Sequence, residues 1–156
     1  MTERSVSHTS FVIERDLPAS PERVFRAWSD PDAKRRWSDC HPEMGGGYSL
    51  DFRPGGSEVS RTVLPDGAVY VVRSHFFDIV PERRIVYAYE MRLSDTCLSA
   101  SLVTVEFTPG DGGTRMVFSE QLAFFDGHED RAERIRGTSD GIDRLEAALR
   151  AEHRDR

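Results

Sequence analysis

The chain has 156 residues, of which 38% are hydrophobic and 31% are charged, and its formal net charge is −6. This composition is typical of a soluble globular protein, and the length is enough for one domain to bury a core. No apolar run approaches the roughly 20 residues that a membrane-spanning helix needs, so we predict no membrane insertion. The basic residues are nearly all arginine and are interspersed with acidic residues, so we predict no nucleic-acid binding.

We expect one domain over residues 1–156, with a core at about 7–151 and frayed ends. The N-terminal residues lack the basic and apolar regions of a secretory signal peptide, so we predict a cytoplasmic protein. Cys40 and Cys97 lie far apart and outside any CxxC pattern, which disfavours a disulfide scaffold or a zinc site. The histidines lack the spacing of metal-binding motifs, and we predict no metal and no cofactor. They are His8, His41, His75, His128 and His153.

A strand followed by two short helices is predicted near the N-terminus. Apolar and polar residues alternate from residue 11, which indicates an edge or half-buried strand that ends before Pro18. Ser20 precedes Pro21, which places an N-cap hydroxyl directly before a proline at the first helical position. Asp30 and Pro31 repeat this pattern and predict the start of the second helix. Two short helices in this place favour a ligand-holding fold over an ordinary barrel.

The rest of the chain reads as a series of strands followed by one long helix. Turns rich in glycine and proline separate the predicted strands, and Pro109 to Gly113 is typical of a hairpin. The predicted strands are 48–53, 58–64, 69–80, 85–93, 99–108 and 114–124. Beyond Asp126 apolar residues recur every three or four positions from Ala132 to Leu149, which predicts a helix of about five turns, with a kink at Gly137 as one outcome.

This order of elements predicts an α+β protein with a curved antiparallel sheet of about six to seven strands. The long C-terminal helix is the element large enough to cover the concave face of the sheet, and the two short helices would close one end. A cavity is expected between sheet and helix, and apolar cavities with a few polar groups are common ligand sites.

Four segments resemble the family of the activator of Hsp90 ATPase homologues. They are the N-terminal run at 11–37, FDIVPERRIVYAYEM at 77–91, LVTVEFTPGDGGTRMVFSEQ at 102–121, and the closing FDG…GTSDGIDRLEAAL. The resemblance extends over roughly 7–149 and implies the helix-grip fold of the START-like, or SRPBCC, superfamily. Some members of that superfamily bind lipids, polyketides or other hydrophobic ligands. Many relatives have Gly-Trp in the final helix, whereas this chain has Gly137-Thr138 and Gly141-Ile142, which implies a cavity of different shape.

Strand parity predicts which side chains face the cavity. The apolar set Met116, Phe118 and Leu122 shares its face with Glu120, so this carboxylate is expected on the inner face. There it would act as an acid, a base or a ligand anchor with a raised pKa, or it would pair with an arginine or lie at the open rim. The predicted cavity residues are Phe25, Trp28, Trp37, Tyr48, Leu50, Phe52, Tyr87, Tyr89, Met91, Val103, Val105, Met116, Phe118, Glu120, Thr138 and Ile142.

Two further features have open alternatives. Gly137 and Gly141 would either let the last helix approach the sheet or a ligand closely, or merely weaken that helix. The run Lys34-Arg35-Arg36 is interpreted as a solvated helix face, because acidic residues flank it.

Three functional hypotheses follow. The first is a binding protein for a small hydrophobic or amphipathic molecule: a lipid, a polyketide or an aromatic metabolite. The second is a cyclase, hydratase or hydrolase that uses Glu120 and a tyrosine without a metal. The third is a protein-interaction or chaperone-associated module, for which a chain of 156 residues is expected to lack the further N-terminal domain of the eukaryotic co-chaperone. Homodimerisation through the outer sheet face or an edge strand stays open.

Overall fold

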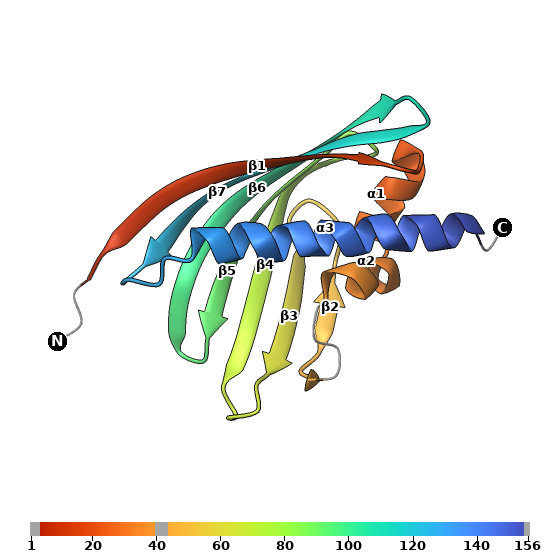
Figure 1. Cartoon of the computed structure of the whole chain (residues 1–156). Helices are drawn as coiled ribbons and strands as arrows, with labels where there is room; N and C mark the ends of the chain where they lie inside the picture. Colours follow the sequence, from red (N-terminus) through yellow and green to blue (C-terminus); the bar gives the residue numbers. More distant parts are fainter. Residues whose placement is uncertain (1–3, 40–43, 155–156) are drawn as a thin grey trace.

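The computed structural model describes residues 4–39 and 44–154, so Cys40 and His41 lie outside the described residues. Within these ranges, seven strands form one antiparallel sheet in the order β1-β7-β6-β5-β4-β3-β2. The sheet is curved, and the long helix α3 crosses its concave face (Figure 1). The elements are β1 (Val6–Leu17), α1 (Pro21–Ser29), α2 (Pro31–Ser38), β2 (Tyr48–Leu50), β3 (Ser57–Val63), β4 (Val69–Val80), β5 (Arg84–Leu93), β6 (Thr96–Gly110), β7 (Gly113–Phe125) and α3 (Arg131–Arg154).

The predicted α+β architecture and the order of its elements are confirmed. Strand β1 is an edge strand, as its alternating pattern indicates, and it pairs with β7 along its whole length. Strand β2 ends at Leu50 and is shorter than predicted, because the chain turns at residues 53–56. In that turn the amide of Gly56 donates a hydrogen bond of 2.8 Å to the carbonyl of Arg53. A Cβ at Gly56 would lie 2.1 Å from the carbonyl oxygen of Asp51, so only glycine fits this turn without a shift of the backbone.

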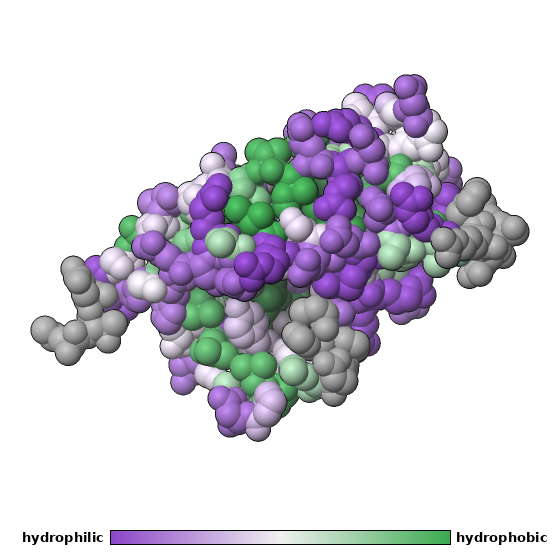
Figure 2. All heavy atoms as spheres, viewed as in Figure 1, coloured by the Kyte–Doolittle hydropathy of each residue, from purple (hydrophilic) through white to green (hydrophobic). Residues whose placement is uncertain are grey.

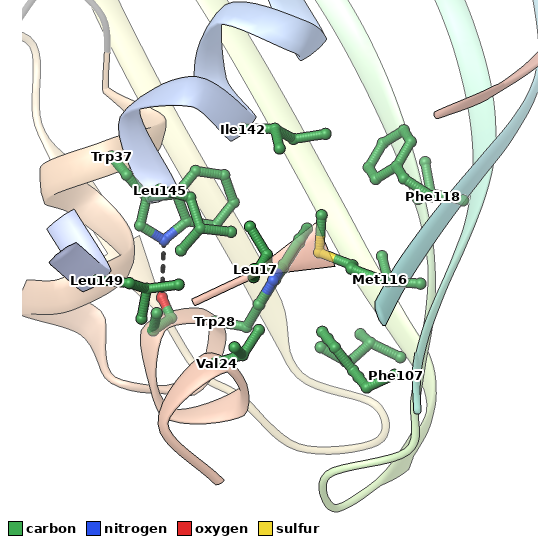
Figure 3. Packing of buried hydrophobic residues seen from close by; sticks show 14 of the residues in the cluster. Leu17, Val24, Trp28, Trp37, Phe107, Met116, Phe118, Ile142, Leu145 and Leu149 are labelled. Carbon is green, nitrogen blue, oxygen red and sulfur yellow. Dashed lines mark hydrogen bonds between the residues drawn. The ribbon is translucent and has the colours of Figure 1, made fainter. Parts of the chain in front are cut away.

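The two short helices begin where the sequence predicts. The Ser20 side chain accepts a hydrogen bond of 3.3 Å from the amide of Arg23, which caps α1. Asp30 is the N-cap residue of α2 but makes no side-chain capping bond. The indole Nε1 of Trp37 donates a bond of 2.9 Å to the carbonyl of Ala27 (dashed line in Figure 3). Because α1 ends at Ser29 and Asp30 has an extended backbone, the carbonyl of Ala27 has no donor within the helix, and the indole satisfies it.

Helix α3 presents different surfaces along its length. Its C-terminal half buries Ile142, Leu145 and Leu149 against α1, α2 and the sheet. Ala132 was predicted on the buried face, but it is exposed, and Arg134 is buried in its place. The apolar stripe therefore does not continue into the first turn of α3, where the helix lies over a polar part of the concave face.

The apolar core fills the end of the molecule closed by α1 and α2. Leu17, Val24 and Trp28 meet Phe107 and Met116 beneath α3 (Figure 3). On the outside, hydrophilic residues follow α3, and apolar residues gather on the sheet below it (Figure 2). The buried cluster also continues along β7 to Leu122 and Phe124, with Ile135 of α3 packed against it.

Candidate functional site

A cavity of about 620 Å³ lies between the N-terminal half of α3, helix α2 and the concave face of strands β2 to β5 and β7. Aromatic side chains supply much of its wall, and three cationic and four anionic side chains line it as well. The lining residues are Trp28, Lys34, Trp37, Ser38, Tyr48, Glu58, Ser60, Tyr70, Val72, Ser74, Tyr87, Tyr89, Met91, Phe118, Glu120, Asp130, Glu133, Arg134, Gly137, Thr138, Gly141, Ile142 and Arg144.

Glu120 on β7 is the most deeply buried ionisable residue of the cavity, with 1% of its surface exposed. Its Oε2 accepts a hydrogen bond of 2.6 Å from the Tyr89 hydroxyl on β5 and one of 2.9 Å from the Ser101 hydroxyl on β6. Nη1 of Arg134 on α3 lies 3.5 Å from the same oxygen. Three adjacent strands and the covering helix therefore meet at one carboxylate oxygen.

Arg134 is 8% exposed and is held by several weak or neutral partners. Nη1 donates a bond of 3.1 Å to the Tyr89 hydroxyl, and Nη2 donates one of 2.8 Å to the Ser99 hydroxyl. Its second carboxylate neighbour, Asp130, lies 4.0 Å from Nη2. The guanidinium carbon also lies 5.3 Å from the centre of the Phe124 ring, a cation–π arrangement. One guanidinium thus lies between two carboxylates, and neither is closer than 3.5 Å.

The other oxygen of Glu120, Oε1, is buried and accepts no hydrogen bond from any residue in the part of the chain that the structure describes. Burial raises the pKa of Glu120 above its ordinary value, and the hydrogen bonds from Tyr89 and Ser101 and the charge of Arg134 only partly oppose this. A buried carboxylate oxygen without a donor is costly. This free acceptor in a cavity wall is the clearest functional signal of the structure.

A second polar cluster lies in the part of the cavity wall built by α2, β2 and β3. Nζ of Lys34 donates to both carboxylate oxygens of Glu58, at 2.9 and 2.8 Å, and the Tyr48 hydroxyl donates to Oε2 at 2.5 Å. Lys34 and Glu58 are 7% and 8% exposed. Nζ also lies 5.3 Å from the ring centres of Trp28 and Trp37. The interpretation of residue 34 as part of a solvated helix face is therefore wrong, although Arg35 and Arg36 are exposed.

The cavity tyrosines are held in their neutral form. Burial raises the pKa of Tyr87 and Tyr89, and the negative charge of Glu120 raises both further. Burial and the charge of Glu58 likewise raise the pKa of Tyr48. These hydroxyls are therefore hydrogen-bond donors over the physiological pH range, and in this structure Tyr89 and Tyr48 donate to carboxylates.

The structure divides the sequence-predicted cavity residues into two groups. Those that line the cavity are Trp28, Trp37, Tyr48, Tyr87, Tyr89, Met91, Phe118, Glu120, Thr138 and Ile142. Those placed outside its lining, which is a correction to the prediction, are Phe25, Leu50, Phe52, Val103, Val105 and Met116. The second group belongs to the core region because other side chains cover it: Phe25, for example, packs edge-on against Phe52 and Phe107. Whether the first group contacts a ligand stays a prediction.

Sequence reasoning missed Arg134, Lys34 and Glu58 as cavity residues. A signal existed for Lys34, because it is the only lysine of the chain and lies three residues before Trp37. For Arg134 the signal was its spacing of four from Thr138 on the same helix face. His75 lies exposed on β4 and does not line the cavity. Within the described ranges, no group of histidine, cysteine and acidic side chains is arranged to hold a metal.

A curved antiparallel sheet that grips a long C-terminal helix, with two short helices after the first strand, defines the helix-grip class of START-like proteins. The family described as Activator of Hsp90 ATPase homolog 1-like protein matches residues 18–151. The chain belongs to this family, as its sequence resemblance implied. No match was found among curated protein sequences.

Two similar solved structures come from rhizobia. A protein from Rhizobium leguminosarum is 51% identical, covers 96% of this chain and 99% of its own, and superposes with a TM-score of 0.91. The Mll3558 protein from Rhizobium loti is 45% identical, with 92% and 98% covered and a TM-score of 0.86. A Staphylococcus aureus protein of unknown function, SA2116, is 18% identical, with 96% and 98% covered and a TM-score of 0.74, which shows a shared fold alone.

The fold is compatible with ligand binding. Among the described residues, no helix is both long and apolar enough to span a membrane.

Proposed function

We propose that this protein binds a small amphipathic molecule in the cavity between the sheet and α3. The single observation that carries this proposal is the pairing of a cavity of about 620 Å³, with seven aromatic side chains in its wall, with the free, buried Oε1 of Glu120. Aromatic walls supply apolar contact, and a few polar groups fix the orientation of a ligand. A volume in this range holds a molecule of the size of a metabolite or a drug.

A panel of lipids, polyketides and aromatic metabolites tests the proposal by thermal shift, followed by titration calorimetry of each compound that raises the melting temperature. Gly137→Phe supplies a blocked cavity. Gly137 lines the cavity, and a Cβ placed there meets no atom within 4 Å, so the new ring has room without displacing the core.

Arg150→Phe is the matched control, because Arg150 is exposed on the same helix and neither it nor its ion-pair partner Glu146 lines the cavity. We expect a compound that stabilises the unmodified protein and the Arg150→Phe variant but has at least about tenfold lower affinity for Gly137→Phe. A wide panel without any stabilising compound, or equal binding to both variants, would contradict binding in this cavity.

Acid–base catalysis by Glu120 is a second candidate, favoured by one observation. A carboxyl group with a pKa raised by burial, in a cavity and 2.6 Å from a tyrosine hydroxyl, is suited to general acid–base catalysis. Cyclisation, hydration and hydrolysis are the reaction classes considered. Each bound compound is incubated with the protein and followed by mass spectrometry. Turnover that Glu120→Gln leaves unchanged would remove Glu120 from this role.

A further inference from the structure

The cavity has an imbalance of charge at the N-terminal end of α3. The guanidinium of Arg144 donates a hydrogen bond to the carbonyl of Trp37, and the ammonium of Lys34 donates to Glu58. Neither of these cations is bonded to Glu120. The remaining lining cation is Arg134, which lies at 3.5 Å from Glu120 and at 4.0 Å from Asp130. One cation thus stands between two carboxylates and contacts neither at the 2.7–2.9 Å that is usual for charge-assisted bonds.

The free oxygen of Glu120 adds an independent observation. Oε2 takes all three neighbouring donors, Tyr89, Ser101 and Arg134, whereas Oε1 has none in the described part of the chain. Because Glu120 lines the cavity, a molecule bound there can supply the donor that Oε1 lacks. Glu120 is only 1% exposed, and a charge-assisted hydrogen bond is stronger in such a buried place than at the surface.

We propose that the ligand is a small organic cation, an amine carried on an aromatic or other apolar body, whose ammonium group donates to Oε1 of Glu120. The proposal rests on the proposed function, because it names the class of molecule that the cavity takes. An ammonium group supplies both the missing donor and the missing positive charge. A carboxylate ligand would place a third anion beside Glu120 and Asp130, and a neutral alcohol would supply the donor without the charge.

The walls around Glu120 suit such a ligand. Tyr70, Tyr87 and Tyr89 line the cavity next to Met91 and Phe118, so an apolar body meets aromatic and thioether surface. The tyrosine rings also attract a cation through their faces. The same preference is already visible in the cavity wall, where the Arg134 guanidinium lies 5.8 Å from the centre of the Tyr89 ring.

Binding of a cation at Glu120 should be linked to pH. Burial raises the pKa of this carboxyl in the free protein, and a neighbouring ammonium lowers it again, so binding releases a proton. The groups bonded to Glu120 are Tyr89, Ser101 and Arg134, and Tyr87 is close enough for the charge of Glu120 to raise its pKa. Neither the tyrosines nor the arginine titrate at neutral pH. Amine affinity is therefore expected to increase as pH rises above the ordinary carboxyl pKa, up to the raised pKa of Glu120.

Three probes of one shape test the charge: 2-phenylethylamine, 2-phenylethanol and 3-phenylpropanoate, each titrated by calorimetry at pH 5 and pH 7.5. We expect the amine to bind at least about tenfold more tightly than the alcohol at pH 7.5, with the carboxylate weakest, and amine affinity to fall at pH 5. Tighter or equal binding of the alcohol or the carboxylate would overturn the proposal while leaving the proposed function intact. If none of the three probes binds but a member of the wider panel does, a cationic ligand would support the proposal and a neutral or anionic ligand would overturn it.

Two variants test the role of Glu120, so that the test stays decisive if one of them fails to fold. Glu120→Gln keeps the size of the side chain and should lower amine affinity at least about tenfold and remove its pH dependence. Arg134→Gln removes the competing cation, so amine affinity should rise and the amine should restore lost thermal stability. Unchanged amine binding in Glu120→Gln, or weaker amine binding in a folded Arg134→Gln protein, would overturn the proposal. Arg150→Gln, altered at an exposed position of α3 whose ion-pair partner Glu146 lies outside the cavity lining, should bind like the unmodified protein.

Discussion

The hydroxyl of Tyr89 on β5 donates a hydrogen bond of 2.6 Å to Oε2 of Glu120 on β7, across the intervening strand β6. This bond connects two side chains that face the cavity, and it holds the carboxylate in place while leaving its second oxygen free. The pKa of Glu120 therefore depends on its burial in the concave face and on the bond from Tyr89.

Replacement of Glu120 by glutamine should change how stability depends on pH. Burial raises the pKa of Glu120 in the folded protein, so the folded state binds this proton more strongly than the unfolded state. The resulting stabilisation is complete below the ordinary carboxyl pKa of 4.5 and is lost as pH rises through the raised pKa. The free energy of unfolding of the unmodified protein, relative to Glu120→Gln, should therefore fall over that window.

Urea unfolding at pH steps from 4 to 9 measures this difference. Each unit of pKa shift corresponds to about 1.4 kcal/mol at full ionisation. Glu146→Gln, altered at a site on α3 outside the cavity, provides a control in which the curve should stay close to that of the unmodified protein. Parallel pH curves for Glu120→Gln and the unmodified protein would contradict a raised pKa.

Breaking the Lys34–Glu58 ion pair should be strongly destabilising. Lys34→Met leaves Glu58 buried with only the Tyr48 hydroxyl as a donor among the contacts described above, and the loss of one partner of a buried pair typically costs about 3–5 kcal/mol. Arg36→Met, on the exposed side of the same helix, should change stability by less than about 0.5 kcal/mol.

A double-mutant cycle separates the pair from its surroundings. Lys34→Met combined with Glu58→Gln removes both charges, so the double variant should be more stable than the sum of the single losses predicts. Chemical denaturation of the four proteins gives the coupling energy. An additive double variant would mean that the two charges do not stabilise one another.

Trp37→Phe should destabilise the protein because the carbonyl of Ala27 loses its hydrogen-bond donor, in addition to any loss of packing. The indole N–H satisfies the buried carbonyl of Ala27, which has no donor within α1 because that helix ends at Ser29. A buried carbonyl without a donor costs about 1–3 kcal/mol, in addition to the apolar surface lost. Trp28→Phe is the matched control, because the buried Trp28 Nε1 has no hydrogen-bond partner among the described residues, so that substitution loses no such bond. Thermal unfolding of the three proteins measures this, and an equal cost of Trp37→Phe and Trp28→Phe would refute the explanation.

Gly137→Ala should stabilise the free protein. A Cβ at Gly137 meets no atom within 4 Å, so nothing in the described structure requires glycine at this position of α3. Replacing a glycine by alanine within a helix gains about 0.5–1 kcal/mol. This favours the alternative that Gly137 weakens the helix over close approach to the sheet.

The matched variant is Gly113→Ala on β7, where a Cβ would lie 2.1 Å from the carbonyl oxygen of Leu17. It should lower the melting temperature, whereas Gly137→Ala should raise it by several degrees. A lower melting temperature for Gly137→Ala would show a close packing role for this glycine after all.

The sequence by itself determined the order and type of the elements. Prolines and caps mark where α1 and α2 begin, glycine-rich turns separate the strands, and the change of period after Asp126 marks α3. Parity also predicted that Glu120 faces inward, because Met116 and Phe118 lie on the same side of β7 and are buried with it. Such features are local, so they can be read from a few neighbouring residues.

Only the tertiary structure decided what the inward groups meet. Lys34 and Glu58 are 24 residues apart and Glu120 and Arg134 are 14 apart, and each pair joins a helix to a strand. Whether such charges pair depends on sheet register, on the height of α3 over the sheet and on where the core ends, which are set by packing of the whole chain. Residues 11–37 thus predicted a closed end of the fold, but only the packed chain reveals that this end is a solid core and that the cavity lies beside it, with one carboxylate oxygen left free.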